Sequence, residues 1–260
     1  MGTLSDKWAD DQIVLGGWAS VPDPLVAETI ARTGFDFVCV DTQHGWVDYS
    51  DSVPMLQGIL YGGSTPIVRV PWNEPGIIGK SLDAGAEAVI VPMVNSIDDA
   101  VAALTAGRYA PDGSRSFGPT AQRPRIAGDL VSWARQSTTV IPMIETVDAV
   151  EKIDEILGVG GIEAIYVGPA DLSVTLGLPA GNNDGDAAFD DALAEIVAGC
   201  RRNGVVPGIH ASGALTARRV EQGFRLITVS GDIVALRRSM SEELAEAKGA
   251  AAPESADGPY

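Results

Sequence analysis

The sequence predicts an α/β fold, namely a (β/α)8 barrel (TIM barrel) in which eight parallel strands alternate with helices. Eight short runs rich in β-branched residues recur along the 260-residue chain, and most are apolar throughout. Such runs are typical of parallel strands that are covered on both faces. Helix-like segments separate the runs, and several end at a glycine, which suits a helix C-terminus. Because a barrel of this kind uses about 250 residues, one domain accounts for nearly the whole chain.

The predicted elements follow one another in a regular order. The eight expected strands span residues 13–19, 35–41, 66–70, 88–92, 139–144, 164–167, 205–209 and 226–229. Among the intervening helices, residues 23–33, 97–106, 186–203 and 212–222 each precede a glycine. We therefore expect one barrel domain over residues 1–248. Residues 249–260, which are rich in Ala, Pro, Gly and Asp, are expected to form a disordered tail.

Composition excludes several classes of function. The chain carries 35 acidic and 18 basic residues, for a formal charge of −17, and such a surface repels the phosphates of nucleic acid. No apolar stretch reaches the length of about 18 residues that a membrane span needs. The polar N-terminus lacks the pattern of a signal peptide, so a cytoplasmic location is expected. Cys39 and Cys200 lie in apolar or mixed runs and are expected to be free buried thiols.

Polar residues stand where the predicted strands end. The second strand runs into Asp41 and His44, the third contains Arg69, the fifth leads into Glu145, and the sixth leads into Asp171. In a barrel, the carboxyl ends of all strands meet at one rim. The sequence therefore brings histidine, arginine, glutamate and aspartate together, which is the combination that metal-assisted carbonyl chemistry requires.

Glu145 and Asp171 form the candidate metal site. Two carboxylates from adjacent strands suit a hard divalent ion, with Mg²⁺ or Mn²⁺ preferred and Co²⁺, Ni²⁺ or Zn²⁺ as alternatives. Such a pair leaves coordination positions open for water and for a 2-oxo acid. Alternatively, either carboxylate caps the helix that follows it. The paired placement favours the metal.

Arg69 and His44 are the candidate catalytic residues at the same rim. Arg69 is permanently charged and can donate to a keto or enolate oxygen, although a structural ion pair is the alternative. Asp41 precedes His44 by three residues, so it can accept from one ring nitrogen and orient the other as acid or base. A purely structural loop histidine is the alternative. His210 follows the seventh strand, where a rim position and a solvent contact are equally compatible with the sequence.

Residues 109–128, rich in Gly, Pro and Arg, lie between the fourth and fifth strands. We interpret them as a long connection from strand to helix, which in a barrel is usually functional. Arg115, Arg123 and Arg125 of this segment are candidates to bind an anionic substrate end or a neighbouring subunit, unless the segment is simply a solvated loop. Asp83 precedes a strand, so by counting it belongs at the opposite end of the barrel.

Six segments of the chain resemble, in order and with similar spacing, the HpcH/HpaI aldolase family. The resemblance covers roughly residues 12–245, and six motifs in sequence make it specific. The segments are Asp-Thr-Gln-His-Gly (41–45), Val-Arg-Val-Pro (68–71), Leu-Asp-Ala-Gly-Ala (82–86), Val-Ile-Val-Pro-Met-Val (89–94), Met-Ile-Glu-Thr (143–146) and Gly-Pro-Ala-Asp-Leu-Ser (168–173).

The resemblance implies a phosphoenolpyruvate/pyruvate-type TIM barrel. It implies a homo-oligomer, usually a hexamer built as a trimer of dimers, or a trimer, with the last helix exchanged between neighbours. It also implies a divalent metal ion at Glu145 and Asp171, with Arg69 and a His44–Asp41 dyad acting on a pyruvate enolate.

The resemblance further implies which residues surround the substrate. The carboxylate of pyruvate meets the turn formed by Gly168, Pro169, Ala170 and Asp171, where a helix begins. Trp18 and Met143 are expected to contact substrate, and Asp83 and Gln43 to belong to the surrounding hydrogen-bond network. Two positions depart from the family pattern. Gln43 stands where many relatives carry Glu, and Met143 stands where some carry a Gln that touches pyruvate, so the second substrate stays open.

We therefore expect a carbon–carbon lyase that forms or cleaves 4-hydroxy-2-oxo acids. Its substrates would be pyruvate, or a 2-oxo acid like hydroxypyruvate, and an aldehyde. Schiff-base chemistry is disfavoured, because Lys80 and Lys152 fall in helix-like segments. Two alternatives stay open, namely decarboxylation of a 2-oxo diacid such as oxaloacetate, and a non-catalytic ligand-binding barrel.

Overall fold

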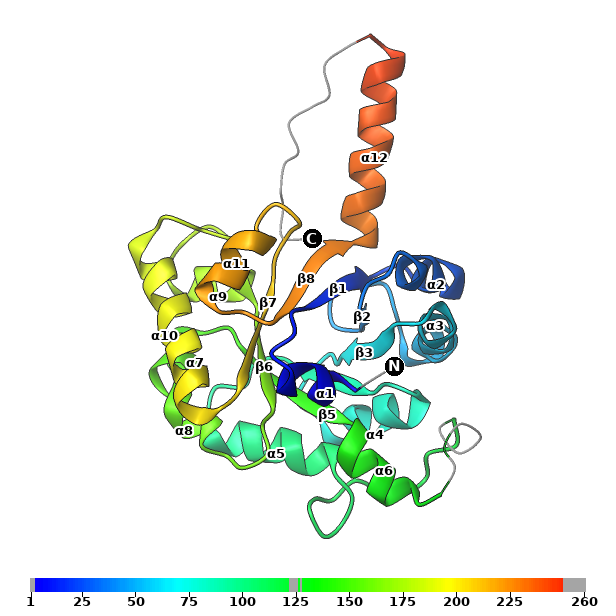
Figure 1. Ribbon diagram of the computed structural model, residues 1–260, viewed down its shortest axis with the longest axis vertical. Coiled ribbons are helices and arrows are strands. Elements are labelled where there is room, and N and C mark those ends of the chain that lie inside the picture. Colours follow the sequence, from blue (N-terminus) through cyan, green and yellow to red (C-terminus); the bar gives the residue numbers. More distant parts are fainter. Residues whose placement is uncertain (1–2, 122–125, 127, 250–260) are drawn as a thin grey trace.

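Eight strands close into a parallel barrel in which every strand pairs with its neighbours in sequence, from β1 round to β8 (Figure 1). The computed structural model describes residues 3–121, 126 and 128–249. The predicted TIM barrel is therefore confirmed. The strands are β1 (Val14–Ala19), β2 (Phe37–Asp41), β3 (Thr65–Arg69), β4 (Ala88–Val91), β5 (Thr139–Ile144), β6 (Ala164–Val167), β7 (Val206–His210) and β8 (Leu226–Gly231).

Helices occupy the connections between the strands. They are α1 (Leu4–Ala9), α2 (Pro24–Arg32), α3 (Tyr49–Gly62), α4 (Pro75–Ala84), α5 (Ile97–Gly107), α6 (Leu130–Ser137), α7 (Val147–Glu151), α8 (Ile153–Leu157), α9 (Pro169–Thr175), α10 (Ala187–Asn203), α11 (Thr216–Gln222) and α12 (Asp232–Ala247). Short side chains cap several N-termini. Asp23 accepts from two backbone N–H groups at the start of α2, and Asp186 does the same for α10. Residues 212–215 form a turn, so α11 begins later than predicted.

Two hydrophobic cores follow from the alternation of side chains along the strands. The outer core lies between strands and helices and includes Val38, Val40 and Val68. The inner core fills the barrel with Phe37, Cys39, Ile67, Ile90, Ile141, Met143, Ala164, Tyr166 and Leu226, and Leu4 of α1 joins it. Two residues further along, at the carboxyl ends of the strands, lie the polar residues Asp41, Arg69, Glu145, His210 and Thr228, together with Gly168.

The long segment after α5 lies at the opposite end of the barrel from the one we predicted. Helix α5 ends at Gly107 and α6 begins at Leu130, so residues 108–129 lead from a helix back toward β5. In a barrel, such connections lie at the amino ends of the strands, away from the catalytic rim. Our interpretation as a strand-to-helix connection was therefore wrong, because the helix comes before the loop. Arg123 and Arg125 lie outside the described residues.

The last helix departs from the compact barrel. Figure 1 shows α12 leaving the end of β8 and standing away from the other helices. The tail that we predicted to be disordered lies, apart from Gly249, outside the described residues. Across the described ranges, no helix is both long enough and apolar enough to cross a membrane.

Candidate active site

A small pocket opens at the carboxyl end of the barrel, where the predicted site residues meet. Five of its lining residues were predicted from the sequence, namely Arg69, Met143, Gly168, Pro169 and Ala170. The others are Tyr166, Gly181, Asn182 and His210. The pocket therefore combines strand ends from β3, β5, β6 and β7 with the start of α9 and the loop that follows it.

Asp41 and Arg69 form a buried ion pair beside the pocket. They are register partners on β2 and β3, and only 0% and 3% of their surfaces are exposed. Nε of Arg69 donates to Oδ1 of Asp41 at 2.9 Å, and a terminal nitrogen donates to Oδ2 at 2.5 Å. The guanidinium also lies over the ring of Trp18, with 5.0 Å to the ring centroid. These contacts fix the plane of the guanidinium next to the pocket.

Asp41 accepts further hydrogen bonds from residues at the carboxyl end of the barrel. Nε1 of Trp18 donates to Oδ2 at 3.2 Å, and the backbone N–H groups of Gln43 and His44 donate to Oδ1 at 3.1 and 3.2 Å. Desolvation acts to raise the pKa of Asp41, but the hydrogen bonds and charge of Arg69 outweigh it, so the pKa lies below its ordinary value. Asp41 is thus an ionised group that holds Arg69 and the backbone at His44. The imidazole of His44 belongs to an exposed residue of the loop after β2.

Glu145 brings a buried carboxyl group to the site. It directly follows β5, its exposed fraction is 2%, and Oε1 accepts from the backbone N–H of Met93 at 2.8 Å. Desolvation, and then the negative charge of Asp171, raise the pKa of Glu145 to about 7, against the opposing effects of Met93 and Arg69. A carboxyl group with a pKa in this range ionises more readily when a bound cation compensates its charge.

Gly168 and Asp171 bring β6 and α9 against Glu145. A Cβ atom on Gly168 would lie 2.2 Å from Oε2 of Glu145, so the turn before α9 has no room for a side chain there. Asp171 is half-buried in the first turn of α9 and acts electrostatically on Glu145. Neither carboxylate serves as the helix cap that we considered: Thr146 caps α7, and the backbone of Gly168 precedes α9.

The donor set fits a divalent cation. Glu145 and Asp171 come from adjacent elements and interact electrostatically, and burial together with the charge of Asp171 raises the pKa of Glu145. Among the described residues, no group of three or more His, Cys, Asp and Glu side chains is placed to hold an ion. The candidate site therefore rests on the Glu145–Asp171 pair, which leaves most of the coordination sphere open.

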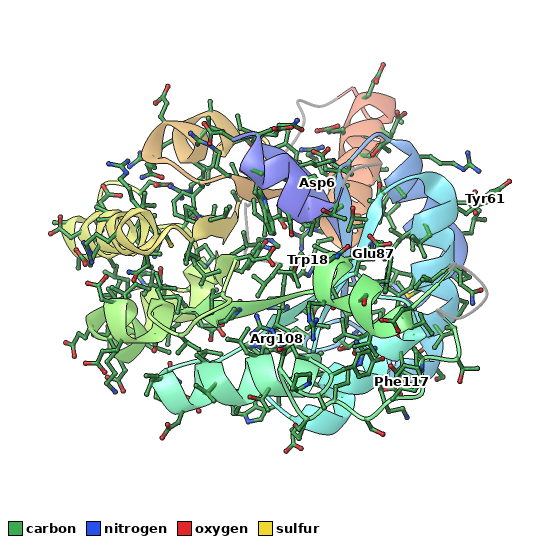
Figure 2. The ribbon with its side chains drawn as sticks, turned by 60° about the horizontal axis from the view of Figure 1, so that its bottom comes forward. Asp6, Trp18, Tyr61, Glu87, Arg108 and Phe117 are labelled. Carbon is green, nitrogen blue, oxygen red and sulfur yellow. The ribbon has the colours of Figure 1, made fainter. Side chains whose placement is uncertain are left out.

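An aromatic wall forms the barrel side of the pocket. Trp18 lies inside the ring of strands (Figure 2), stacks on Tyr166 at 5.8 Å between ring centroids, and meets the edge of His210 at 5.0 Å. The hydroxyl of Tyr166 donates to Thr228 at 2.5 Å. Desolvation, and then the charge of Arg69, lower the pKa of His210 to about 4, so its ring is neutral at pH 7. Tyr166 is a site residue that the sequence did not reveal, because the apolar run of β6 does not show which of its residues face inward.

Met93 is a second residue that the sequence did not reveal. Its φ of 56° is left-handed, which is unusual for a residue with a side chain. In this backbone conformation, the N–H group of Met93 donates a hydrogen bond to Glu145. Its carbonyl accepts from the side chain of Asn95, whose own amide oxygen accepts from Thr146, the residue after Glu145. The β4 and β5 loops are therefore tied together around the carboxyl group.

Asp83 lies apart from this pocket within the chain. It is near the C-terminal end of α4, and Oδ1 accepts from Arg115 at 2.6 Å. Arg115 is buried, and its guanidinium lies 4.4 Å from the ring centroid of Tyr109. Asp83 and Arg115 thus belong to the amino end of the barrel. This is the end that we predicted for Asp83 from its position before a strand.

A profile of the HpcH/HpaI aldolase/citrate lyase family matches residues 14–237. The chain belongs to this family. It is 35% identical to the hydroxypyruvate/pyruvate aldolase of Rhizorhabdus wittichii, over 95% of this chain and 99% of that protein. It is also 35% identical to the 4-hydroxy-2-oxo-heptane-1,7-dioate aldolase of Salmonella dublin, over 91% and 90%.

The fold comparison agrees with the HpcH/HpaI assignment. The crystal structure of the HpcH/HpaI aldolase from Desulfitobacterium hafniense superposes with a TM-score of 0.88 at 26% identity, and it covers 95% of this chain and 97% of that one. Aldolases are similar to this protein along nearly the whole chain. The predicted enzyme class, a carbon–carbon lyase, is therefore confirmed.

Proposed function

We propose that this HpcH/HpaI family member is a class II aldolase that forms and cleaves 4-hydroxy-2-oxo acids through a pyruvate enolate. The buried carboxyl of Glu145 carries the proposal, because it lies against Gly168 and within the field of Asp171, beside a pocket that Arg69 lines. The relatives named as hydroxypyruvate/pyruvate and 4-hydroxy-2-oxo-heptane-1,7-dioate aldolases support the same substrate class. The 2-oxo acid would be pyruvate or hydroxypyruvate.

Glu145 and Asp171 would hold a divalent metal ion, with Mg²⁺ or Mn²⁺ as the expected choice. When bound, such an ion polarises the keto group and offsets the negative charge of the enolate. Gly168 lets the turn before α9 approach Glu145 closely, and the N–H groups near Ala170 and Asp171 would receive the carboxylate of pyruvate.

Arg69 would stabilise the oxygen on which negative charge develops. Its guanidinium is already oriented by Asp41 and Trp18, so no reorganisation accompanies the reaction. In cleavage, His44 or a water molecule that it activates would remove the proton of the C4 hydroxyl, after which the C3–C4 bond breaks and an aldehyde leaves. Asp41 would position both Arg69 and His44. Its carboxylate accepts hydrogen bonds from the side chain of Arg69 and from the backbone N–H of His44.

Aldol addition tests the proposal directly. The purified protein, treated with chelator and then reloaded with Mg²⁺ or Mn²⁺, is incubated with pyruvate and glycolaldehyde, and the 4-hydroxy-2-oxo acid is measured. Product that depends on the added metal supports the proposal. Release of CO₂ from oxaloacetate without any aldol product would favour the decarboxylase alternative, and binding of pyruvate without turnover would favour a ligand-binding barrel.

We also propose a homo-oligomer in which α12 contacts a neighbouring copy, as a hexamer or a trimer. Its apolar residues Leu236, Met240 and Leu244 recur at helical spacing and are 55%, 62% and 54% exposed. An exposed apolar stripe on a helix that stands away from its own barrel supports contact with another subunit. The cytoplasmic location stays a prediction.

A further inference from the structure

The loop between α9 and α10, residues 176–186, forms one wall of the candidate active site. Gly181 and Asn182 of this loop line the pocket. The loop is fastened to α9, because Oγ of Ser173 donates to the carbonyl of Gly181 at 2.8 Å and accepts from Asn183 at 2.8 Å. The same helix carries Asp171, so the loop wall and the candidate metal ligand are held together.

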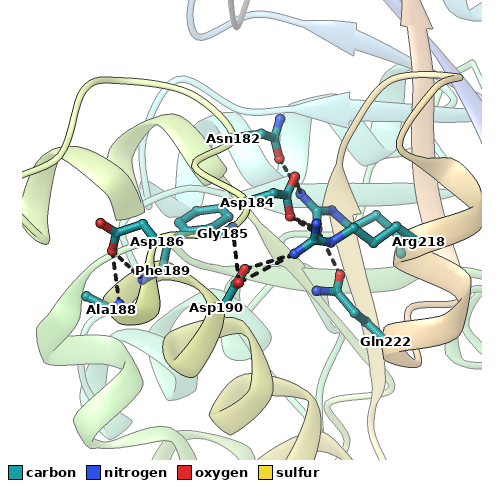
Figure 3. A network of polar contacts seen from close by, with 10 residues as sticks. Asn182, Asp184, Gly185, Asp186, Ala188, Phe189, Asp190, Arg218 and Gln222 are labelled. Carbon is teal, nitrogen blue, oxygen red and sulfur yellow. Dashed lines mark hydrogen bonds and ion pairs between the residues drawn. The ribbon is translucent and has the colours of Figure 1, made fainter.

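Arg219 of α11 fastens the loop from the other side. It is fully buried, and two of its nitrogens each make two hydrogen bonds: one donates to Asp184 at 2.7 Å and Gln222 at 2.8 Å, and the other donates to Asn182 at 2.7 Å and Asp184 at 2.9 Å. Figure 3 shows Asn182, Asp184 and Gln222 grouped in this network. A guanidinium used in this way holds its partners in one geometry.

The contact with Arg219 decides which way the amide of Asn182 faces. A guanidinium can only donate, so Asn182 must present its oxygen to Arg219. The NH₂ group of the same side chain then faces away from Arg219, and none of the described residues accepts from it. Asn182 is exposed and lines the pocket, so this fixed donor is available to a molecule bound there.

We propose that Asn182 is a specificity-determining residue for the aldehyde and that Arg219 is its positioning residue. The inference rests on the proposed aldolase function. There, the oxygens of pyruvate are taken by Arg69, the metal pair and the start of α9, which leaves the Asn182 donor for the second substrate. An amide donor recognises an aldehyde that carries a hydroxyl or carboxylate next to its carbonyl, and it offers nothing to a purely apolar aldehyde.

Two variants of Asn182 separate the donor from the structure of the loop. Asn182→Asp keeps an oxygen for Arg219 but removes the NH₂ group, and Asn182→Ala removes both without adding charge. At saturating pyruvate, both variants are expected to raise the KM for glycolaldehyde by roughly 3- to 10-fold, the usual effect of one lost hydrogen bond. The KM for acetaldehyde and the rate of deuterium exchange at the methyl group of pyruvate should change less than twofold.

Arg219→Met tests the positioning role, with Arg202→Met as the matched control. Arg202 is an exposed arginine of α10 that bonds Asp154 and Glu195, outside the loop. Arg219→Met should raise the KM for glycolaldehyde at least as much as Asn182→Ala, whereas Arg202→Met should behave like the unmodified protein. If Arg219→Met does not fold, the two Asn182 variants still decide the question.

Three results would overturn the inference. Equal changes in KM for glycolaldehyde and acetaldehyde would show that the loop acts by shape alone. A parallel loss of pyruvate exchange would put Asn182 in the pyruvate subsite. An unchanged KM for glycolaldehyde in both Asn182 variants, with normal exchange, would overturn the inference while leaving the aldolase proposal intact. Failure of the unmodified, metal-loaded protein to exchange pyruvate at all would overturn both.

Discussion

Asp41 and Arg69 stand opposite each other in the β2–β3 register and share two hydrogen bonds inside the barrel mouth. The pair is buried, so each charge depends on the other for compensation. Asp41 also binds the backbone at His44 and the indole of Trp18, which joins the candidate enolate-stabilising group to the candidate base and to the aromatic wall. One carboxylate thus sets the geometry of three predicted site residues.

Arg69→Ala should lower kcat/KM for aldol cleavage by about 100-fold, since loss of one preorganised donor to a developing oxyanion costs about 3 kcal/mol. Arg69→Lys should recover little, because an ammonium group cannot make the two-point contact with Asp41. Either substitution leaves Asp41 as a buried charge with less compensation, which can destabilise the fold. Thermal unfolding of each variant therefore has to be measured alongside, to show that the protein is folded. Turnover close to that of the unmodified protein in folded Arg69→Ala would remove Arg69 from the mechanism.

Metal binding should release a proton from Glu145 at mildly acidic pH. Burial and the charge of Asp171 raise the pKa of this carboxyl to about 7, and a cation must displace its proton. Isothermal titration of Mn²⁺ in buffers of different ionisation enthalpy should detect nearly one proton released at pH 6 and almost none at pH 8.5. Glu145→Gln should abolish the release, and equal heats in all buffers at pH 6 would contradict the assignment.

The same pKa predicts how the metal-free protein responds to pH. Folded Glu145 keeps its proton up to about pH 7, whereas the unfolded chain releases it near 4.5. The folded state therefore binds more protons between these values, so this group lowers the stability as the pH rises through that window, by up to about 3 kcal/mol. Comparing the pH dependence of denaturant unfolding between the unmodified protein and Glu145→Gln isolates this contribution.

His210 should stay neutral in the folded protein down to about pH 4. Desolvation and the charge of Arg69 lower its pKa from 6.5 to that value. An unfolded histidine takes up a proton near pH 6.5, so this residue stabilises the fold fully above that pH and less as the pH falls toward 4. NMR of histidine-labelled protein, assigned with His210→Asn, measures the titration. A midpoint near 6.5 would contradict the effect of desolvation and of Arg69 on this ring.

Leu236→Glu combined with Met240→Glu should weaken the oligomer. Both side chains lie on the exposed stripe of α12, and burying two carboxylates in an apolar contact is strongly unfavourable. Light scattering coupled to size-exclusion chromatography should report a smaller assembly at micromolar concentration. Glu242→Gln, on the opposite face of the same helix, serves as the control. An unchanged mass in the double variant would mean that α12 does not hold the assembly together.

The barrel and much of the site could be predicted from sequence because both depend on the order of short segments along the chain. Apolar runs marked the strands, and their carboxyl ends marked Arg69, Glu145 and Asp171, since parallel strands must end at the same rim. Residues whose position depends on distant partners could not be predicted. Asn182 reaches the pocket because Arg219, far along the chain, holds it there, and the left-handed backbone of Met93 has no sequence signature.

Two misjudgements have clear physical causes. The length and the arginines of residues 109–128 favoured a strand-to-helix connection, but α5 precedes these residues and turns the chain to the other end of the barrel. Tyr166 was passed over because a continuous apolar run does not reveal which residues face inward. Its alternation with Ala164 places it in the inner core, directly beneath the pocket.

Exchange of the pyruvate methyl protons with deuterium, followed by NMR, tests the central claim without any assumption about the aldehyde. Enolate formation at the Glu145–Asp171 site predicts exchange that disappears with chelator, returns with Mg²⁺ or Mn²⁺, and is lost in Glu145→Gln. Absence of exchange in the fully metal-loaded protein, or exchange that persists unchanged in chelator and in Glu145→Gln, would contradict it.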